Sequence, residues 1–378
     1  MSNVVIAGYA RSPFTPAVRG ELARTRPDDL TAQVVRALVE RTAVDPAHVE
    51  DLILGCAFPE GEQGFNAARL VALLADLPQT VAGTTVNRFC GSSMQSVHMA
   101  AGAIAMGAGE AFICAGVESM SRVPMQGFNP MPNPDMVNHA PAAYMSMGET
   151  AENVAGKYEI SRSEQEQFAV ASHAKAVKAV SAGNLTDELV PITTNGEEIS
   201  VDGCIRPDTT AEGLSQLKPA FDARGSVTAG TSSPLTDGAA AVLVTSAEFA
   251  EQQGLTPLAR IKSSAVAGCD PSIMGMGPVH ASAKALSRAG LQMGDMDLIE
   301  LNEAFASQAL ACMRESGIDA ARVNLDGGAI ALGHPLGATG ARITGKAAAL
   351  VAREGAQYAL ATQCIGGGQG IATILERV

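Results

Sequence analysis

Hydrophobic positions along roughly the first 120 residues alternate between short continuous runs and amphipathic segments. The run Val4–Tyr9 has the composition of a buried strand, whereas Asp29–Thr42 repeats apolar residues at helical spacing. Further strands are predicted at Val49–Gly55, Gly83–Val86 and Ala111–Ala115, and further helices at Asn66–Ala75 and directly after Cys90. Strands that alternate with helices predict an α/β fold in which a mostly parallel sheet carries helices on its faces.

The pattern changes between Met120 and about Thr228. Methionines and prolines crowd the first part of this segment, and charged loops follow a long predicted helix at Ser163–Ala182. The methionines are Met120, Met125, Met131, Met136, Met145 and Met147. Such a segment predicts an insertion with its own irregular fold, whose mobile apolar side chains fill gaps or line an adaptable binding surface.

The regular alternation returns at Gly238–Thr245, and after Gly254 the first pattern recurs. The sequence Asp51-Leu52-Ile53-Leu54 is echoed by Asp297-Leu298-Ile299-Glu300, at an offset of 297 − 51 = 246 residues. These few identities indicate an internal duplication of one α/β unit. Two such units would bring equivalent strand ends together, and ligands bind at the carboxyl ends of strands.

Chain length sets the expected domain organisation. A chain of 378 residues exceeds what one simple core accommodates, so two or three domains are expected. We place an N-terminal domain at residues 1–252, with the inserted subdomain at about 119–228, and a C-terminal domain at residues 253–378.

Composition narrows the function classes. The net charge of −13 argues against nucleic-acid binding, which needs a basic face. Seven scattered cysteines without a CxxC pair form neither a disulfide framework nor a zinc site, and they favour a reducing compartment. No apolar run approaches the roughly 18 residues of a membrane span, and the N-terminus lacks the features of a signal peptide. A cytoplasmic protein is therefore expected.

The stretch Asn87–Met94 holds the first candidate for chemistry. Its Cys90 follows a predicted strand and precedes a cluster of small residues that opens a helix. Unpaired backbone N–H groups and the positive end of the helix dipole stabilise a thiolate at such a position. Most cysteines in apolar surroundings are inert core residues, so partners elsewhere must decide. With such partners, Cys90 is predicted to be a nucleophile with a lowered pKa.

Three later stretches supply those partners. His334 lies in Gly-Gly-x-x-x-x-Gly-His-Pro and is a candidate base for the thiol. Cys364 precedes three glycines, so exposed backbone amides are expected around it to receive an oxyanion while the thiol carries a proton. Asn302 follows the predicted strand Leu298–Leu301, where it orients a water, donates to a carbonyl or caps a helix. A near match to a phosphate loop at Gly340–Ala347 lies in a predicted helix and lacks the metal-binding Ser or Thr, so we regard it as chance.

Together these stretches resemble the thiolase family of acetyl-CoA C-acyltransferases. The resemblance lies in Asn-Arg-x-Cys-Gly-Ser-Ser around Cys90, Asn-Glu-Ala-Phe at 302–305, Gly-Gly-Ala-Ile-Ala-Leu-Gly-His-Pro-Leu-Gly at 327–337 and Cys-Ile-Gly-Gly-Gly-Gln-Gly at 364–370. It runs nearly end to end and includes the segment 227–240. It implies the thiolase fold, with two duplicated βαβαβαββ halves in a layered αβαβα arrangement and an inserted loop subdomain.

The resemblance also implies roles in a Claisen cleavage. Cys90 takes the acyl group, and His334 lowers the pKa of that thiol and helps hold the thioester oxygen. Asn302 fixes a water in the same oxyanion hole, while Cys364 protonates the leaving acetyl-CoA enolate. The backbone N–H groups of Cys90 and Gly366 form the second oxyanion hole. Such chemistry needs coenzyme A as co-substrate but no permanently bound cofactor and no metal.

By the same resemblance, six residues correspond to coenzyme A contacts of the family. They are Arg206, Leu217, Phe221, Ser233, Met274 and Phe305. Short-chain acetoacetyl-CoA thiolases carry a loop histidine before Met-Gly, where this chain has Ser146 in Tyr-Met-Ser-Met-Gly. This difference favours a 3-ketoacyl-CoA thiolase of broad chain length, and the run Cys90–Gln95 also resembles the bacterial fatty-acid β-oxidation enzymes.

Three alternatives are weighed against that prediction. A biosynthetic acetoacetyl-CoA thiolase, which condenses two acetyl-CoA, is the nearest. A ketoacyl-ACP synthase shares the fold but uses a Cys-His-His set, where this chain has Cys364. A non-catalytic CoA-binding scaffold should have lost a chemical residue, and none is missing here. Family members are obligate dimers, so a homodimer or homotetramer is expected, with a hydratase/dehydrogenase as an expected partner.

Overall fold

The computed structural model describes residues 3–378, and Met1 and Ser2 at the start of the predicted N-terminal domain lie outside it. The strands are β1 (Val4–Arg11), β2 (Thr15–Pro16), β3 (Asp51–Cys56), β4 (Ala82–Val86), β5 (Ala111–Ser119), β6 (Ile192–Thr194), β7 (Glu197–Ile199), β8 (Thr236–Ser246), β9 (Ala259–Gly268), β10 (Leu298–Leu301), β11 (Tyr358–Ile365) and β12 (Gln369–Glu376). The α-helices are α1 (Pro27–Thr42), α2 (Ala67–Leu74), α3 (Ser92–Ala105), α4 (Pro134–His139), α5 (Met147–Lys157), α6 (Arg162–Ser181), α7 (Ala211–Ser215), α8 (Ala247–Gln252), α9 (Gly277–Ala289), α10 (Ala306–Ser316), α11 (Ala329–Leu332) and α12 (Leu336–Glu354). These bounds confirm the predicted strands and helices to within a few residues.

The large sheet has the order β10-β11-β12-β9-β1-β8-β5-β3-β4, with β2 beside β8. The prediction of a mostly parallel sheet is wrong. Within residues 3–378, β3–β4, β3–β5 and β10–β11 are parallel, whereas the remaining neighbours in this sheet are antiparallel. The alternation of strands and helices does not reveal in which direction the later strands enter the sheet. β8 joins β5 only after the long insertion, and β12 folds back from β11 through a turn with positive φ at Gly367 and Gly368, which forces an antiparallel pair.

The strand order confirms the predicted duplication. The series β3-β5-β8-β1 is repeated by β10-β11-β12-β9, and corresponding pairs run in the same relative directions. In the parallel pair of each half, facing residues are 61 positions apart, as for Asp51 with Phe112 and Leu298 with Ala359 (112 − 51 = 359 − 298). In the sheet of residues 3–378, the two halves join where β1 pairs with β9, through Val5 and Ile6.

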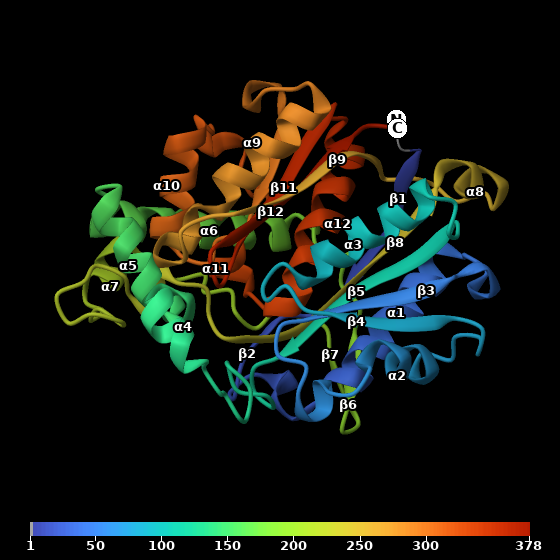
Figure 1. The fold of residues 1–378 in the computed structure, drawn as a ribbon, viewed down its shortest axis with the longest axis horizontal. Coiled ribbons are helices and arrows are strands. Elements are labelled where there is room, and N and C mark those ends of the chain that lie inside the picture. Colours follow the sequence, from blue (N-terminus) through green and yellow to red (C-terminus); the bar gives the residue numbers. More distant parts are fainter. Residues whose placement is uncertain (1–2) are drawn as a thin grey trace.

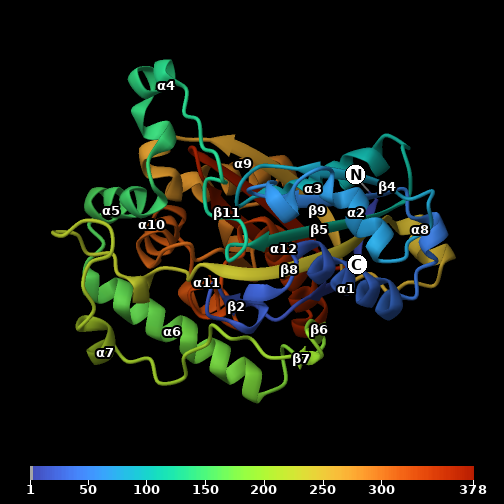
Figure 2. The same ribbon diagram turned by 90° about the horizontal axis from the view of Figure 1, so that it is seen from below.

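Helices and strands form five layers (Figures 1 and 2). Helices α1 and α2 cover the outer face of the first half of the sheet, α3 and α12 lie in the middle, and α9 with α10 covers the second half. Because α12 packs against strands of both halves and against α3, its position is set from both sides. The α3–α12 contact is close: a Cβ on Gly340 would lie 2.2 Å from the Met94 backbone nitrogen.

The insertion lies between β5 and β8 and contains α4 to α7 and the β6–β7 hairpin. Its helices α5 and α6 pack on α10, and α6 also packs on α11, so a segment inserted into the first half covers the second (Figure 2). Capping boxes begin both helices, at Ser146 with Glu149 and at Ser161 with Glu164. In the described part of the chain, no helix is long and apolar enough to cross a membrane.

Candidate active site

The turn between β4 and α3 presents Cys90. Phe89, directly before it, has a φ of 42°, a left-handed conformation that is strained for a bulky residue. Side chains hold the turn: Asn87 Oδ1 accepts the Phe89 N–H at 2.7 Å, and Ser92 Oγ accepts the Arg88 N–H at 2.9 Å. The predicted position of Cys90 at a strand-to-helix junction is therefore confirmed, with Gly91 as the N-cap of α3.

The resting Cys90 thiol is not the low-pKa group that the sequence predicted. Burial raises its pKa to about 11, and the charge of Glu118 acts in the same direction. The backbone N–H groups of Gly366 and of Cys90 itself lower the pKa, but burial outweighs them. The prediction considered only the N–H donors at the helix start. The sequence does not show which distant segments exclude water from the thiol and so raise its pKa. Those two N–H groups are nevertheless the predicted oxyanion pair, and both act on the Cys90 sulfur.

His334 is buried in the loop before α12 and is held on two sides. Its backbone N–H donates to Thr236 Oγ1 at 3.0 Å, and its Nδ1 lies 2.6 Å from Thr339 Oγ1. The Thr339 hydroxyl donates to the Pro335 carbonyl, so it accepts the hydrogen of His334 Nδ1. This assignment leaves the lone pair of Nε2 as a hydrogen-bond acceptor. Burial, followed by the charge of Arg342, lowers the pKa of His334 to about 3, so the ring is neutral at pH 7.

Asn302 lies beside that lone pair. Its Nδ2 is 3.4 Å from His334 Nε2, and its buried Oδ1 has no hydrogen-bond partner in the described chain. The backbone N–H of Asn302 donates to Thr362 O, which ties it to the end of β11. An amide with a free acceptor next to the imidazole has the chemistry to orient a water, one of the roles considered for this residue.

Cys364 ends up in an apolar enclosure. The sequence predicted exposed amides around it, but the thiol is buried among the side chains of Ala151, Val227, Met274, Ala304 and Phe305, with Met147 packed against them. The three glycines after it shape the turn to β12 instead. Burial and then the charge of Cys90 raise the pKa of Cys364, which places the two sulfurs within electrostatic range.

Four of the six predicted coenzyme A contacts group near Cys364. Met274 and Phe305 pack around Cys364, the Phe221 ring stands edge-on to Phe305 at 5.9 Å, and Ser233 donates to Ala304 O. Leu217 is part-exposed beside Gly230. Arg206 has an exposed side chain, and its backbone N–H donates to His173 on α6.

The methionines of the insertion were predicted to fill gaps or line a binding surface, and Met147 Sδ lies 3.4 Å from where a Cβ on Gly366 would be. Other residues at this site carried no sequence signal of their own. Gln363 Nε2 donates to the Cys90 carbonyl, and Thr339 sets the tautomer of His334. These contacts join segments far apart in the chain. A residue pattern shows none of them.

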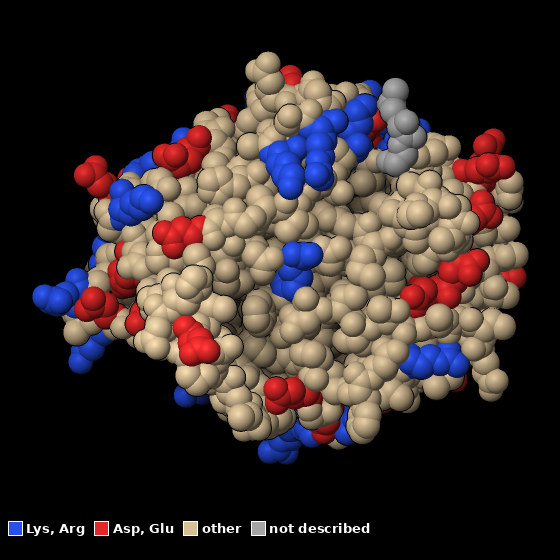
Figure 3. Space-filling view, viewed as in Figure 1, with Lys and Arg blue, Asp and Glu red and all other residues tan. Residues whose placement is uncertain are grey.

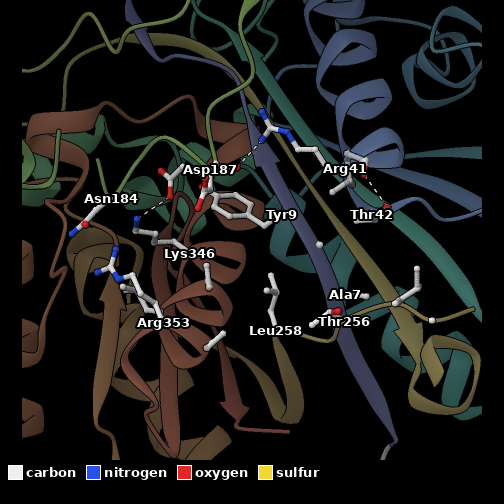
Figure 4. Close-up of a pocket in the computed structure, with 18 residues that line it drawn as sticks. Ala7, Tyr9, Arg41, Thr42, Asn184, Asp187, Thr256, Leu258, Lys346 and Arg353 are labelled. Carbon is white, nitrogen blue, oxygen red and sulfur yellow. Dashed lines mark hydrogen bonds and ion pairs between the residues drawn. The ribbon is translucent and has the colours of Figure 1, made fainter. Parts of the chain in front are cut away.

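A separate cavity of about 580 Å³ lies away from these residues (Figure 4). It is lined from β1, α1, α12 and the loops around Asp187 and Thr256, and none of the predicted site residues reaches it. The near match to a phosphate loop lies in α12, as predicted, and its Lys346 is ion-paired with Glu188 and Asp326. No group of His, Cys, Asp and Glu between residues 3 and 378 is arranged to hold a metal ion.

Comparison with known families settles the kinship. Residues 4–248 match the family described as "Thiolase, N-terminal domain", and residues 255–377 match "Thiolase, C-terminal domain". The chain belongs to the thiolase family. It is 48% identical over 389 residues to a 3-ketoacyl-CoA thiolase of Bacillus subtilis and 49% identical over 391 residues to one of Idiomarina loihiensis, with all of each chain covered.

Solved thiolase structures agree with this fold. The human mitochondrial 3-ketoacyl-CoA thiolase in complex with CoA has a TM-score of 0.92 at 39% identity, covering 99% of this chain and 98% of that one. The Bacillus anthracis acetyl-CoA acetyltransferase also has a TM-score of 0.92, at 41% identity, covering 100% of this chain and 99% of that one. The predicted layered thiolase fold is confirmed.

Proposed function

We propose that this thiolase is a 3-ketoacyl-CoA thiolase, which cleaves 3-ketoacyl-CoA with coenzyme A to acetyl-CoA and a shortened acyl-CoA. The observation that carries the proposal is that the end of β11 meets the Cys90 turn: Gln363, next to Cys364, donates to the Cys90 carbonyl, and the Gly366 N–H hydrogen-bonds to the Cys90 sulfur. The full-length relatives named as 3-ketoacyl-CoA thiolases support the same activity. Coenzyme A is then a co-substrate, and the reaction needs no resident cofactor.

The first step adds Cys90 to the substrate. The Cys90 sulfur attacks the 3-keto carbon to give a tetrahedral adduct, and the thiol proton passes to the lone pair of His334 Nε2. The transfer creates two opposite charges together, and their attraction offsets part of the cost of burial. His334 and a water on Asn302 stabilise the oxygen of the substrate's CoA thioester. The N–H groups of Cys90 and Gly366 stabilise the oxyanion on the carbon that Cys90 attacks.

The second step breaks the bond between C2 and C3. Its electron pair becomes the enolate of acetyl-CoA, and Cys364 supplies the proton that completes acetyl-CoA. Coenzyme A then attacks the Cys90 thioester and gives its thiol proton to the Cys364 thiolate. The Cys90 thiolate that leaves takes back the proton held by His334, and the shortened acyl-CoA departs, so atoms and charges balance over the cycle.

The chain-length preference is decided by kinetics. Each buried CH₂ of an acyl chain gains about 0.8 kcal/mol, and Met147 beside Gly366 can move aside at little cost. We expect kcat/KM in the thiolytic direction, at saturating coenzyme A, to hold or rise from 3-ketobutyryl-CoA to 3-ketooctanoyl-CoA. A fall of about tenfold or more would instead indicate a closed pocket. That result would favour the biosynthetic acetoacetyl-CoA thiolase, the alternative that the Bacillus anthracis structure supports.

A pair of variants tests which methionine limits the acyl chain. Met147→Phe adds bulk next to Gly366 and should lower kcat/KM for 3-ketooctanoyl-CoA by about tenfold, with a smaller effect on 3-ketobutyryl-CoA. Met131→Phe is the matched control, because Met131 is 83% exposed in the same insertion. Equal effects of the two variants on kcat/KM would show that Met147 does not line the acyl pocket.

The assembly that we propose is a homodimer or a dimer of dimers. Strand β4 has a free edge, and large apolar side chains are exposed beside it on α2 and around α3, including Phe65 (96%) and Met106 (88%). Figure 3 shows a mostly uncharged surface on this side, with one patch of Lys or Arg at its centre. A light-scattering mass near 38.6 kDa at micromolar concentration would contradict the dimer.

Three further proposals complete the description. We place the domain boundary between residues 252 and 253, with the insertion at about 119–228, and the family matches that end at 248 and begin at 255 support it.

A cytoplasmic location is supported by the seven cysteines, all of which are free. A hydratase/dehydrogenase is the expected partner, because those two activities produce the 3-ketoacyl-CoA that this site would consume.

A further inference from the structure

Glu118 at the end of β5 is a buried carboxylate held only by hydrogen-bond donors. Its five donors are the backbone N–H groups of Ala57 (2.9 Å), Phe58 (3.2 Å) and Gly337 (2.9 Å), Gln63 Nε2 (2.9 Å) and Cys56 Sγ (3.8 Å). Both of its oxygens accept, and no Lys or Arg of the described chain forms an ion pair with it. Burial raises the pKa of Glu118, while the hydrogen bonds that it accepts favour the ionised carboxylate and act in the opposite direction.

One of those donors belongs to the helix that follows His334. Gly337 is the second residue of α12, and a Cβ on it would lie 2.3 Å from the Val117 carbonyl oxygen, so the helix start rests directly on the end of β5. The first N–H groups of a helix have no partner within it. Without the Glu118 oxygen, the Gly337 N–H would be buried and unpaired, which is costly. Glu118 therefore ties the loop after β3 to the start of α12.

We propose that Glu118 is a positioning residue of the active site, whose carboxylate holds the first turn of α12 so that His334 stays in reach of Cys90. This inference rests on the proposed function for its kinetic consequences, but the contact itself does not. The duplication adds a second argument. Glu118 and Cys364 are equivalent positions of the two halves (364 − 118 = 246). The same strand end therefore carries a positioning residue in the first half and the proposed proton donor in the second.

The charge of Glu118 also reaches Cys90, where it raises the pKa of the thiol. Cys364 at the end of β11 also interacts electrostatically with Cys90, and His334 lies in the loop before α12. Arg88 lies in the same turn, but its guanidinium is bound to Gln95 and Gln369. Removing the charge of Glu118 while keeping its shape therefore makes the thiol easier to ionise and at the same time loosens His334.

The test is Glu118→Gln, whose amide cannot accept at both oxygen positions. We expect kcat to fall about 10²-fold with KM nearly unchanged, because small displacements of a catalytic group cost about that much. Iodoacetamide should alkylate Cys90 about tenfold faster at pH 7, which corresponds to a pKa lowered by about one unit. Glu118→Asp keeps the charge, so it should retain the wild-type alkylation rate and recover part of kcat.

Glu188→Gln is the matched control for loss of a buried carboxylate. Glu188 binds Arg11 and Lys346 away from both cysteines, so this variant should lose stability without changing Cys90 alkylation. The proposal is overturned if Glu118→Gln retains kcat, or if Cys114 and Cys364 are alkylated together with Cys90, which would signal unfolding. If wild-type protein fails to cleave 3-ketoacyl-CoA, the proposed function fails, while the alkylation comparison still decides the role of Glu118.

Discussion

The carboxyl end of β3 in the first half corresponds to the carboxyl end of β10 in the second, and the ends of β5 and β11 correspond in the same way. At these equivalent positions, Cys56 and Glu118 stand in the first half where Asn302 and Cys364 stand in the second (302 − 56 = 364 − 118 = 246). The first pair forms a buried acceptor network, whereas the second faces the imidazole and the nucleophile. One scaffold therefore serves two purposes.

The helices that follow show the same division. The loop before α3 carries Cys90 and the loop before α12 carries His334, and the two helices pack against each other in the central layer. The thiol and the candidate base thus stand at the starts of two helices that pack together, although the two residues are far apart in sequence. The difference between the halves shows that duplication supplies the geometry and that later substitution assigned the chemistry.

Removing the nucleophile tests the assignment most severely. Cys90→Ala should form no acyl-enzyme and should lower the thiolytic rate by about 10⁴-fold or more, because no other group of the site can hold the acyl chain. Mass spectrometry of protein mixed with an acyl-CoA donor reads the adduct directly. An adduct of the same mass on the variant would place the nucleophile elsewhere.

Cys364→Ala should distinguish the role of the cysteine in the second half from that of Cys90 in the first. The variant should still become acylated on Cys90, but carbon–carbon cleavage should fall about 10²–10⁴-fold because the proton donor is gone. Parallel measurement of acyl-enzyme formation and of thiolysis distinguishes the steps. Equal loss of both steps in Cys90→Ala and Cys364→Ala would contradict the division of labour between the halves.

The pH dependence of alkylation tests the resting state of the first half. With a pKa of about 11, the Cys90 thiol is largely protonated at neutral pH, so its iodoacetamide rate should rise about tenfold per pH unit from 7 to 10. His334, with a pKa lowered to about 3, should add no inflection between pH 5 and 8. Cys269, half-buried and also with a pKa raised to about 11, is the internal reference. A plateau for Cys90 below pH 8 would show that the thiolate exists at rest.

The smallest expected effect lies where the two helices cross. Gly340 of α12 and Met94 of α3 are equivalent under the repeat (340 − 94 = 246), and a Cβ on Gly340 would lie 2.2 Å from the Met94 nitrogen. Gly340→Ala should therefore cost about 1–3 kcal/mol of unfolding free energy in urea denaturation. Gly102→Ala in α3 is the control: its Cβ would meet nothing within 4 Å, and it should stabilise by about 0.5–1 kcal/mol. Equal behaviour of the two variants would mean that the crossing is loose.

The amino-acid sequence alone determined the elements and the repeat of this thiolase, and it indicated the candidate reacting residues. Strand and helix periodicity is a local property, so the bounds of most elements could be predicted, and an offset of 246 residues was enough to indicate the duplication. The residues Cys90, His334, Asn302 and Cys364 stand in short motifs whose order along the chain is itself distinctive.

The tertiary structure decided strand direction, protonation and support. Antiparallel pairing of β8 and β12 depends on how long connections return, which no local pattern encodes. The raised pKa of Cys90 and the apolar surroundings of Cys364 come from desolvation by distant segments. The role of Glu118 depends on the packing of the start of α12 against the end of β5. The buried N–H of Gly337 needs a hydrogen-bond acceptor, and Glu118, more than 200 residues earlier in the chain, supplies it.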